Sequence, residues 1–183
     1  DYLWYSTGDM ANHTDLASGV LGEGTLQARY IRGAFDDKPF TLGKYESVRI
    51  RAAIAELAAN GGAPMGFYSS FQDPDARREL VRYYGFLRQY EKLYRANRPN
   101  GEVLLLFPRS RVHEGDVSGV VRFKELGKRL LDAHVLFDVL SDDGDATTRT
   151  TRARYETIID PSDMPLTINT ILGKLAFRFS HFE

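Results

Sequence analysis

The sequence predicts an α/β protein built on parallel sheets, and three observations lead to that prediction. Strand-like and helix-like segments alternate regularly along the 183 residues. The strand-like segments are continuous apolar runs, such as residues 103–107, rather than period-two patterns. Parallel strands have this pattern because helices cover both of their faces. Finally, 43% of the residues are hydrophobic and 12% aromatic, which is enough to bury a core in one domain or two small ones.

Charge and composition exclude several classes of function. The 24 basic and 25 acidic residues give a net charge of −1, so no general attraction to nucleic acid or an anionic membrane is expected. The absence of cysteine excludes disulfides, thiolate catalysis and cysteine metal sites. No apolar stretch approaches the ~20 residues of a membrane span. The opening "DYLWY" is already strand-like and shows no signal-peptide pattern, so we expect the chain to start inside a domain.

The first half of the chain is expected to form short strands that alternate with helices. The expected strands are 1–5, 38–45 and 63–71, and the expected helices are 25–35, 46–62 and 72–97. Thr25 is the predicted N-cap of the first helix, and Gly61 and Gly62 end the second. Pro74 suits the first turn of the third helix. The apolar stripe of that helix is predicted to be Leu80, Tyr84, Leu87, Tyr90 and Tyr94.

The second half is expected to begin after a linker, "RPNG". Strands are expected at 102–107, 135–142 and 155–161, a helix at 117–133 and a polar loop at 143–154. The first of these strands is the most apolar, which predicts a central position in a parallel sheet. Domain boundaries are therefore expected at 1–98 and 99–183. The first segment has the pattern of the closing part of a (β/α)8 barrel, and the second that of the first strands of a flavodoxin-like, doubly wound parallel sheet.

Several of these segments together resemble one family. They are "AAIAELAANGGAPMGFYSSF", the long aromatic helix, "EVLLLFPRSR", "LLDAHVLFDVLSDD" and "YETIIDP". In this respect the chain is similar to bacterial glycoside hydrolases of the family-42 β-galactosidase type and their hypothetical relatives. In that family a catalytic (β/α)8 barrel is followed by an amidotransferase-like trimerisation domain. The resemblance covers roughly residues 1–161 and implies hydrolysis of O-glycosidic bonds in the intact protein; for this chain alone we expect no catalysis.

The resemblance also implies where catalytic carboxylates belong. Retaining glycosidases use two carboxyl groups about 5 Å apart, one as acid/base and one as nucleophile. In the family the nucleophile ends the seventh barrel strand, which corresponds here to "KPFTLGKYE". Leu42 and Gly43 occupy that position, and the nearest carboxylate is Glu46. This departure from the family pattern leaves the identity of the nucleophile open.

Two glutamates are the candidate catalytic residues. Glu23 lies between two glycines at the end of an apolar run, where it can project into a barrel mouth. The structural alternative is an acid that simply precedes a helix, where negative charge is favoured. Glu46 has the same helix-terminal alternative. Candidate sugar-binding residues are Asp9, Trp4, Tyr68 and Phe71, because aromatic faces suit the apolar faces of pyranoses, although core packing explains aromatic residues equally well.

Other motifs are weaker. "GEGTLQA" has Gln27 where a dinucleotide fingerprint requires its third glycine. Arg109 and Arg111 can hold an anion at the carboxyl edge of the sheet, but His113 has no nucleophile beside it, so interdomain or subunit contacts are the preferred role of this loop. "SDDGDA" lacks the spaced oxygens of a calcium site and is expected to be a turn. No cofactor and no metal are therefore expected.

Two hypotheses of different classes remain open. The first is a fragment of a carbohydrate-active hydrolase with a carbohydrate substrate. The second is a non-catalytic α/β module that provides structural or oligomerisation contacts. Neither involves nucleic acid or a membrane, and both admit a homo-oligomer. The sequence does not identify the sugar, the linkage or the cellular compartment.

Overall fold

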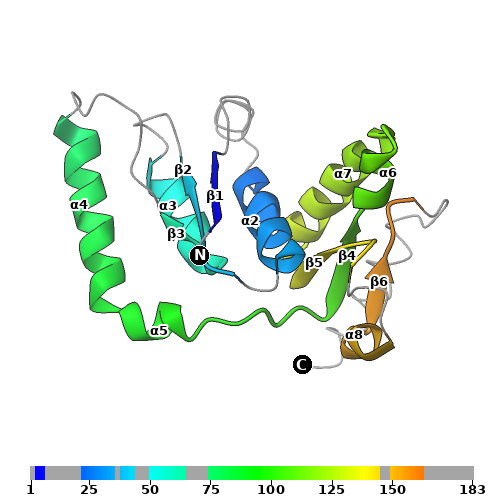
Figure 1. Ribbon diagram of the computed structural model, residues 1–183. Helices are drawn as coiled ribbons and strands as arrows, with labels where there is room; N and C mark the ends of the chain where they lie inside the picture. The colour runs from blue at the N-terminus through cyan, green and yellow to red at the C-terminus, as the bar shows by residue number, and fades with distance from the viewer. Residues whose placement is uncertain are drawn as a thin grey trace. The chain divides into compact units, whose positions relative to one another are not determined.

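The protein is an α/β protein with parallel sheets (Figure 1). The computed structural model describes residues 3–6, 22–35, 38–43, 50–64, 74–144 and 149–162. Within these ranges the strands form two separate three-stranded sheets. The chain divides into two compact units, 1–100 and 101–183, a division that falls within the segment expected to be a linker.

The sheet of the first unit contains strands in chain order. Strands β1 (Leu3–Ser6), β2 (Phe40–Gly43) and β3 (Ala63–Pro64) pair in the order β1-β2-β3, and both pairs are parallel. Helix α2 (Glu23–Ala34) lies between β1 and β2 in the chain, and helix α3 (Ile50–Ala59) lies between β2 and β3. Strands β1 and β2 are thus each followed by a helix and then by the strand with which they pair, which is the repeating β/α unit.

Helix α2 begins earlier than the sequence predicts. Its N-cap is Gly22, with a φ of 112°, rather than Thr25. A positive φ is accessible to glycine without steric cost, so the chain turns into the helix at this residue. Thr25 lies inside the first turn, buried, and its hydroxyl donates a hydrogen bond to Glu56 Oε1 of α3 at 3.0 Å. Gly24 makes room for that carboxylate, since a Cβ there would lie 2.6 Å from a Glu56 oxygen.

Helix α3 ends as predicted at its two glycines. Gly61 has a φ of 80°, and its N–H donates to the carbonyl of Ala58 at 3.2 Å. The N–H of Gly62 donates to the carbonyl of Leu57 at 2.8 Å. These two bonds form a Schellman motif, which satisfies carbonyls that the helix leaves without intrahelical partners. The chain then turns directly into β3.

The predicted long helix 72–97 is two helices. Helix α4 (Pro74–Gln89) starts at the expected proline, and helix α5 (Glu91–Arg95) follows a break at Tyr90. Tyr90 leaves helical geometry, with φ −106° and ψ 22°, and its carbonyl accepts the N–H of Leu93 at 3.0 Å, a tight i→i+3 turn. Tyr90 is therefore exposed and not part of the buried stripe. None of the helices in the described ranges has both the length and the apolar character to cross a membrane.

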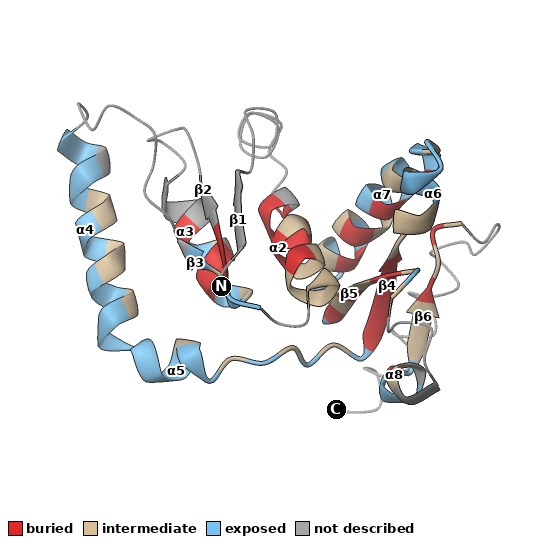
Figure 2. Cartoon of the chain, viewed as in Figure 1, coloured by how far each residue is buried: buried red, intermediate tan, exposed pale blue. Residues whose placement is uncertain are grey.

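One face of α4 packs on α3. The fully buried Ile54 of α3 is surrounded by side chains of α4, namely Leu80, Tyr83, Tyr84 and Leu87. Burial raises the pKa of the Tyr84 phenol. The other faces of α4 are exposed, as Figure 2 shows by the pale blue along this helix.

The second unit contains a sheet in a different order. Strands β4 (Val103–Phe107), β5 (Phe137–Ser141) and β6 (Thr157–Ile159) pair as β5-β4-β6, and both pairs are parallel, as predicted. The central β4 carries the core: its residues 103–105 are 0% exposed (Figure 2). Helix α7 (Ser118–Asp132) connects β4 to β5 and packs on β4, where the rings of Phe107 and Phe123 meet edge to face at 5.2 Å between centroids.

Three parts of the second unit depart from the prediction. Helix α6 (Arg109–His113) was not expected, and helix α8 (Arg149–Arg154) lies within the segment predicted to be a polar loop. Strand β5 alternates between buried and half-buried residues, whereas a continuous apolar strand was expected. One of the two half-buried residues is Asp138, whose carboxylate accepts a hydrogen bond from the Tyr155 hydroxyl at 3.1 Å and lies 3.4 Å from Arg154.

Candidate functional site at the carboxyl edge of the second sheet

The residues predicted for catalysis and sugar binding are placed only in part. Glu23 is the first residue of α2 and Trp4 lies in β1, although their side chains are outside what the structure describes. Asp9, Glu46, Tyr68 and Phe71 lie outside the described residues. Their predicted roles therefore remain predictions. The structure does describe the carboxyl edge of the second sheet, where β4, β5 and β6 end.

Strands β4 and β5 end level at this edge, and β6 ends two positions short of them. Phe107 pairs in register with Ser141, and Leu105 pairs with Ile159, so the residues that follow β4, β5 and β6 emerge side by side. Ligands of open parallel sheets bind at such an edge, where the connections to successive strands diverge in direction. Helix α6 follows β4 immediately, and Asp142 and Asp143 follow β5. These two segments form the candidate site.

An ion pair joins the two segments. The Arg109 Nε atom lies 2.8 Å from Asp143 Oδ1 and 3.0 Å from Oδ2, and both side chains are about one quarter exposed. The hydrogen bond from Arg109, above all, holds the pKa of the Asp143 carboxyl below its ordinary value, and the positive charge of Arg109 acts in the same direction. Arg109, which the sequence suggested as an anion ligand, thus holds a carboxylate of its own chain.

A second contact fixes the start of α6. The backbone N–H of Ser110 donates to Asp142 Oδ1 at 2.9 Å, and the Ser110 hydroxyl donates to Asp142 Oδ2. The backbone N–H of Asp142 in turn donates to the carbonyl of Phe107 at 3.0 Å. Asp142 therefore satisfies an amide at the start of a helix and ties β5 to the end of β4. The sequence contained a sign of this contact, because two acidic residues directly follow a buried strand. The sequence analysis nevertheless predicted only a turn for this segment.

Two further charged groups of the loop, Arg111 and Asp116, are also engaged. Arg111 Nη1 lies 3.6 Å from Asp116 Oδ2, and Asp116 Oδ1 accepts the N–H of Ser118 at the start of α7. Hydrogen bonds from Ser118, above all, lower the pKa of Asp116. His113 is exposed on α6. Both arginines of "PRSRVHEG" are thus paired with acids, which favours the predicted structural role of this loop over anion binding.

One polar atom at this edge is isolated. The Ser141 side chain is 3% exposed, and its Oγ has no hydrogen-bond partner in the part of the chain that the structure describes. No histidine or other general base among the described residues is hydrogen-bonded to it. The same ranges contain no group of three or more histidine and acidic side chains that could hold a metal ion. The contacts described at this edge join α6 to the end of β5 within the chain.

We expect the ion pair at this edge to stabilise the fold at neutral pH and to lose that effect in acid. Because the pKa of Asp143 is lower in the folded protein, the interaction stabilises the fold above about pH 4 and is lost as the pH falls through the folded-state value. Replacing Arg109 with glutamine should raise the Asp143 pKa, measured by NMR titration of the carboxyl carbon, and cost at most about 1 kcal/mol at neutral pH. Arg111→Gln is the matched control, since Arg111 contacts Asp116 instead. An unchanged Asp143 titration in Arg109→Gln would contradict the assignment.

Comparison with known proteins does not identify this chain: no family model, no curated protein and no solved structure matches it.

Proposed function

We propose that this chain is part of a carbohydrate-active hydrolase of the family-42 β-galactosidase type. In this proposal the first unit belongs to the closing part of the catalytic (β/α)8 barrel, and the second to the amidotransferase-like trimerisation domain. One observation carries it. A sheet whose parallel strands follow chain order, β1-β2-β3, is succeeded by a sheet in the order β5-β4-β6. A barrel followed by a flavodoxin-like sheet, as the resemblance implies, would give these two strand orders in this succession.

Each of the two strand orders is typical of a different fold. In a barrel every strand pairs with the next strand along the chain, with a helix between them, and the first unit has this arrangement. In a flavodoxin-like sheet the second strand lies on one side of the first, and the third strand lies on the other. The order β5-β4-β6 has that pattern, because the chain passes from the central β4 to β5 and then across to β6. Both orders support the proposal, and other barrel strands would come from residues outside the printed sequence.

The substrate site of the proposed enzyme lies at the carboxyl ends of β1, β2 and β3. In barrel enzymes the loops after these strand ends carry the catalytic groups. Glu23 begins the helix that follows β1, and Glu46 follows the end of β2 in the chain. In the chain, Trp4 lies within β1, Asp9 follows β1, and Tyr68 and Phe71 follow β3. Their gathering at one side of the barrel is part of the proposal.

A second candidate function is a non-catalytic structural or oligomerisation module. The specific observation in its favour is the carboxyl edge of the second sheet, where Asp142 and Asp143 bind groups of their own chain. The absence of a carboxylate at Leu42 and Gly43, where the family has its nucleophile, also favours it. The two functions are compatible within one protein if catalysis belongs to the first unit and assembly to the second.

Hydrolysis of chromogenic aryl glycosides by the intact protein tests the proposal. Nitrophenyl β-galactoside, α-arabinoside, β-glucoside and β-fucoside cover the neutral pyranoses and a furanose. We expect turnover of at least one β-linked substrate, together with a homo-oligomeric mass in light scattering. A folded, oligomeric protein that hydrolyses none of them would contradict the hydrolase and support the module.

A further inference from the structure

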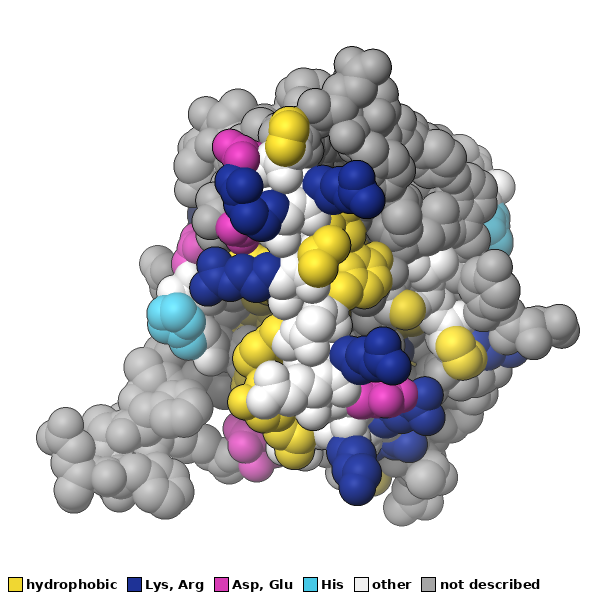
Figure 3. All heavy atoms as spheres, turned by 90° about the vertical axis from the view of Figure 1, so that its left-hand side faces the viewer, with side chains coloured by type: hydrophobic (Ala, Val, Ile, Leu, Met, Phe, Trp, Pro, Cys, Tyr) yellow, Lys and Arg dark blue, Asp and Glu magenta, His cyan; other side chains and the backbone are white. Residues whose placement is uncertain are grey.

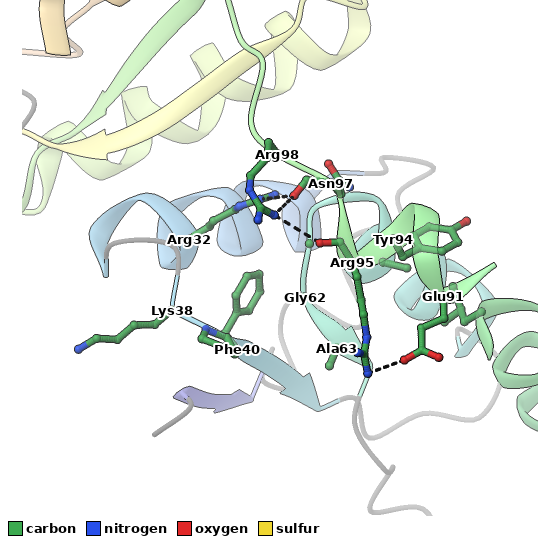
Figure 4. A pocket seen from close by; sticks show the side chains of 14 residues that line it. Arg32, Lys38, Phe40, Gly62, Ala63, Glu91, Tyr94, Arg95, Asn97 and Arg98 are labelled. Carbon is green, nitrogen blue, oxygen red and sulfur yellow. Dashed lines mark hydrogen bonds and ion pairs between the residues drawn. The ribbon is translucent and has the colours of Figure 1, made fainter. Parts of the chain in front are cut away.

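The segment that leaves the first unit, residues 96–98, is hydrogen-bonded to that unit before the chain reaches the second. The Asn97 side-chain nitrogen donates to the carbonyl of Ala59, at the end of α3, at 3.0 Å. Arg32 of α2 donates to the carbonyl of Asn60 at 3.2 Å and to that of Asn97 at 3.0 Å. In Figure 4 the Arg32 side chain reaches toward the Asn97 backbone. We call these three hydrogen bonds the clasp.

A glycine leaves room for the clasp. Gly61 has a φ of 80°, and a Cβ there would lie 2.5 Å from Arg32 Nη1 and 2.9 Å from Arg32 Cζ. A side chain at this position would therefore displace the guanidinium group from the two carbonyls that it binds. The same glycine that ends α3 thus allows Arg32 to reach the segment after α5.

Apolar packing contributes little to holding this segment. Helix α5 has five residues and none of them is buried, and a helix of this length is not stable on its own. The described surface of α4 and α5 carries many basic side chains, shown in dark blue in Figure 3. A pocket of about 540 Å³ is lined both by residues 97–98 and by the starts of β2 and β3, so the segment does not pack closely on the sheet. The clasp therefore determines where the segment lies.

The second unit holds the chain again from Gly101 onward. A Cβ at Gly101 would lie 2.6–2.9 Å from backbone atoms of residues 137–138, at the start of β5, so this residue must be a glycine for the chain to pass so close. The carbonyl of the next residue, Glu102, accepts the N–H of Glu156 at 2.9 Å. Residues 98–100 are thus the part of the chain between the clasp and the second unit.

We propose that the clasp makes the connection between the two units a short, stiff spacer formed by residues 98–100. Pro99 fixes its own φ and restricts the preceding Arg98 to extended conformations. Asn100 is then the one residue of the spacer with ordinary torsional freedom. Relative motion of the two units is confined to these few torsion angles.

The clasp changes the length of the connection. With the clasp formed, the chain from Asn97 to Gly101 spans at most about 14 Å. Without it, the connection would begin at the break between α4 and α5 and would include residues 91–100. A connection of that length would behave as a flexible tether. This inference does not rest on the proposed function, because each of its contacts lies within one unit.

Trypsin digestion of the intact protein tests the clasp. Trypsin cleaves the bond after Arg95 when α5 and the turn that follows it open, and it does not cleave the Arg98–Pro99 bond. Asn97→Ala removes the hydrogen bond to the Ala59 carbonyl. We expect cleavage after Arg95, quantified by mass spectrometry, to become about three- to tenfold faster in this variant, since the open form is more populated.

Asn100→Ala is the matched control, because Asn100 is an exposed asparagine three residues further along and lies outside the clasp. It should leave the cleavage rate within about twofold of the parent. Asn97→Ala should keep the circular dichroism spectrum of the parent, because the bond that it removes joins no strand of the sheet. Equal cleavage rates in Asn97→Ala and Asn100→Ala would overturn the proposal.

Backbone amide relaxation measured by NMR tests the stiffness of the connection. In the parent protein we expect order parameters of about 0.85 at Ala96, Asn97 and Arg98, as in the rigid helices. Arg32→Gln removes the charged donor of two of the three bonds and should lower these values toward 0.6 or below. Values below about 0.6 in the parent would show that the segment is already mobile, and the stiff spacer would be refuted.

Discussion

Replacing Leu104 with alanine is expected to lower the free energy of unfolding of the second unit by about 2–5 kcal/mol. Leu104 is the second residue of the central strand β4 and is 0% exposed. It packs in a cluster with Leu106 and Tyr155, with Leu140 and Ile158 beside them. The lost methyl groups leave a cavity among side chains from three strands, which cannot close without moving the sheet.

Chemical denaturation, followed together with hydrogen exchange of the β4 and β5 amides, measures this loss in the unit concerned. Leu136→Ala is the control, since Leu136 directly precedes β5 and is 62% exposed. It should change stability by less than about 0.5 kcal/mol. If Leu104→Ala cost no more than Leu136→Ala, β4 would not be the centre of the core.

The sequence predicted the second sheet well because its central strand is buried on both faces. Five consecutive apolar residues at 103–107 leave few alternatives to a covered parallel strand, and the structure places them between β5 and β6. The end of α3 was equally predictable, because only glycine adopts the positive φ of Gly61 without strain. In both cases the local pattern and the tertiary arrangement require the same residues.

Other features depend on contacts between distant residues. The break at Tyr90 lies within a continuous helical pattern, so periodicity alone gave one helix where there are two. The true start of α2 depends on Gly22, whereas Thr25, a good N-cap by residue type, faces Glu56 across 31 positions. Helix α8 consists of threonine, arginine and alanine, a polar composition that resembles a loop.

In the candidate site, too, some features could be predicted from the local sequence and others depend on contacts between distant residues. Sequence reasoning identified the loop after β4 and its arginines, because the end of a central parallel strand is a predictable position. It could not supply the partners of those arginines. Asp143 lies 34 residues from Arg109, and only the parallel register of β4 with β5 brings the two side chains together. The hydrogen bonds from Arg32 of α2 to the carbonyls of Asn60 and Asn97 depend likewise on how the segment after α5 lies against the end of α3.

Glu23→Gln is expected to reduce glycoside turnover by about a hundredfold or more while leaving the fold intact, if the protein is the proposed hydrolase. The change removes the negative charge and the nucleophilic oxygen but keeps the shape of the side chain. Glu23 is the first residue of α2, after the carboxyl end of β1, and Gly22 and Gly24 flank it. A helix N-terminus favours a negative charge, which suits a carboxylate that must remain ionised in order to attack.

Two further variants distinguish catalysis from a structural effect. Glu46→Gln tests the other candidate, and whichever of the two glutamates is the nucleophile should form the covalent glycosyl-enzyme that mass spectrometry detects with a slow 2-fluoro substrate. Glu56→Gln perturbs α2 at its contact with Thr25 and keeps both candidate glutamates, so it should retain turnover. If Glu56→Gln and Glu23→Gln lost activity equally, the loss would come from α2 itself. Full turnover in both Glu23→Gln and Glu46→Gln would place the nucleophile elsewhere in the protein, and this chain would then contribute scaffold rather than chemistry.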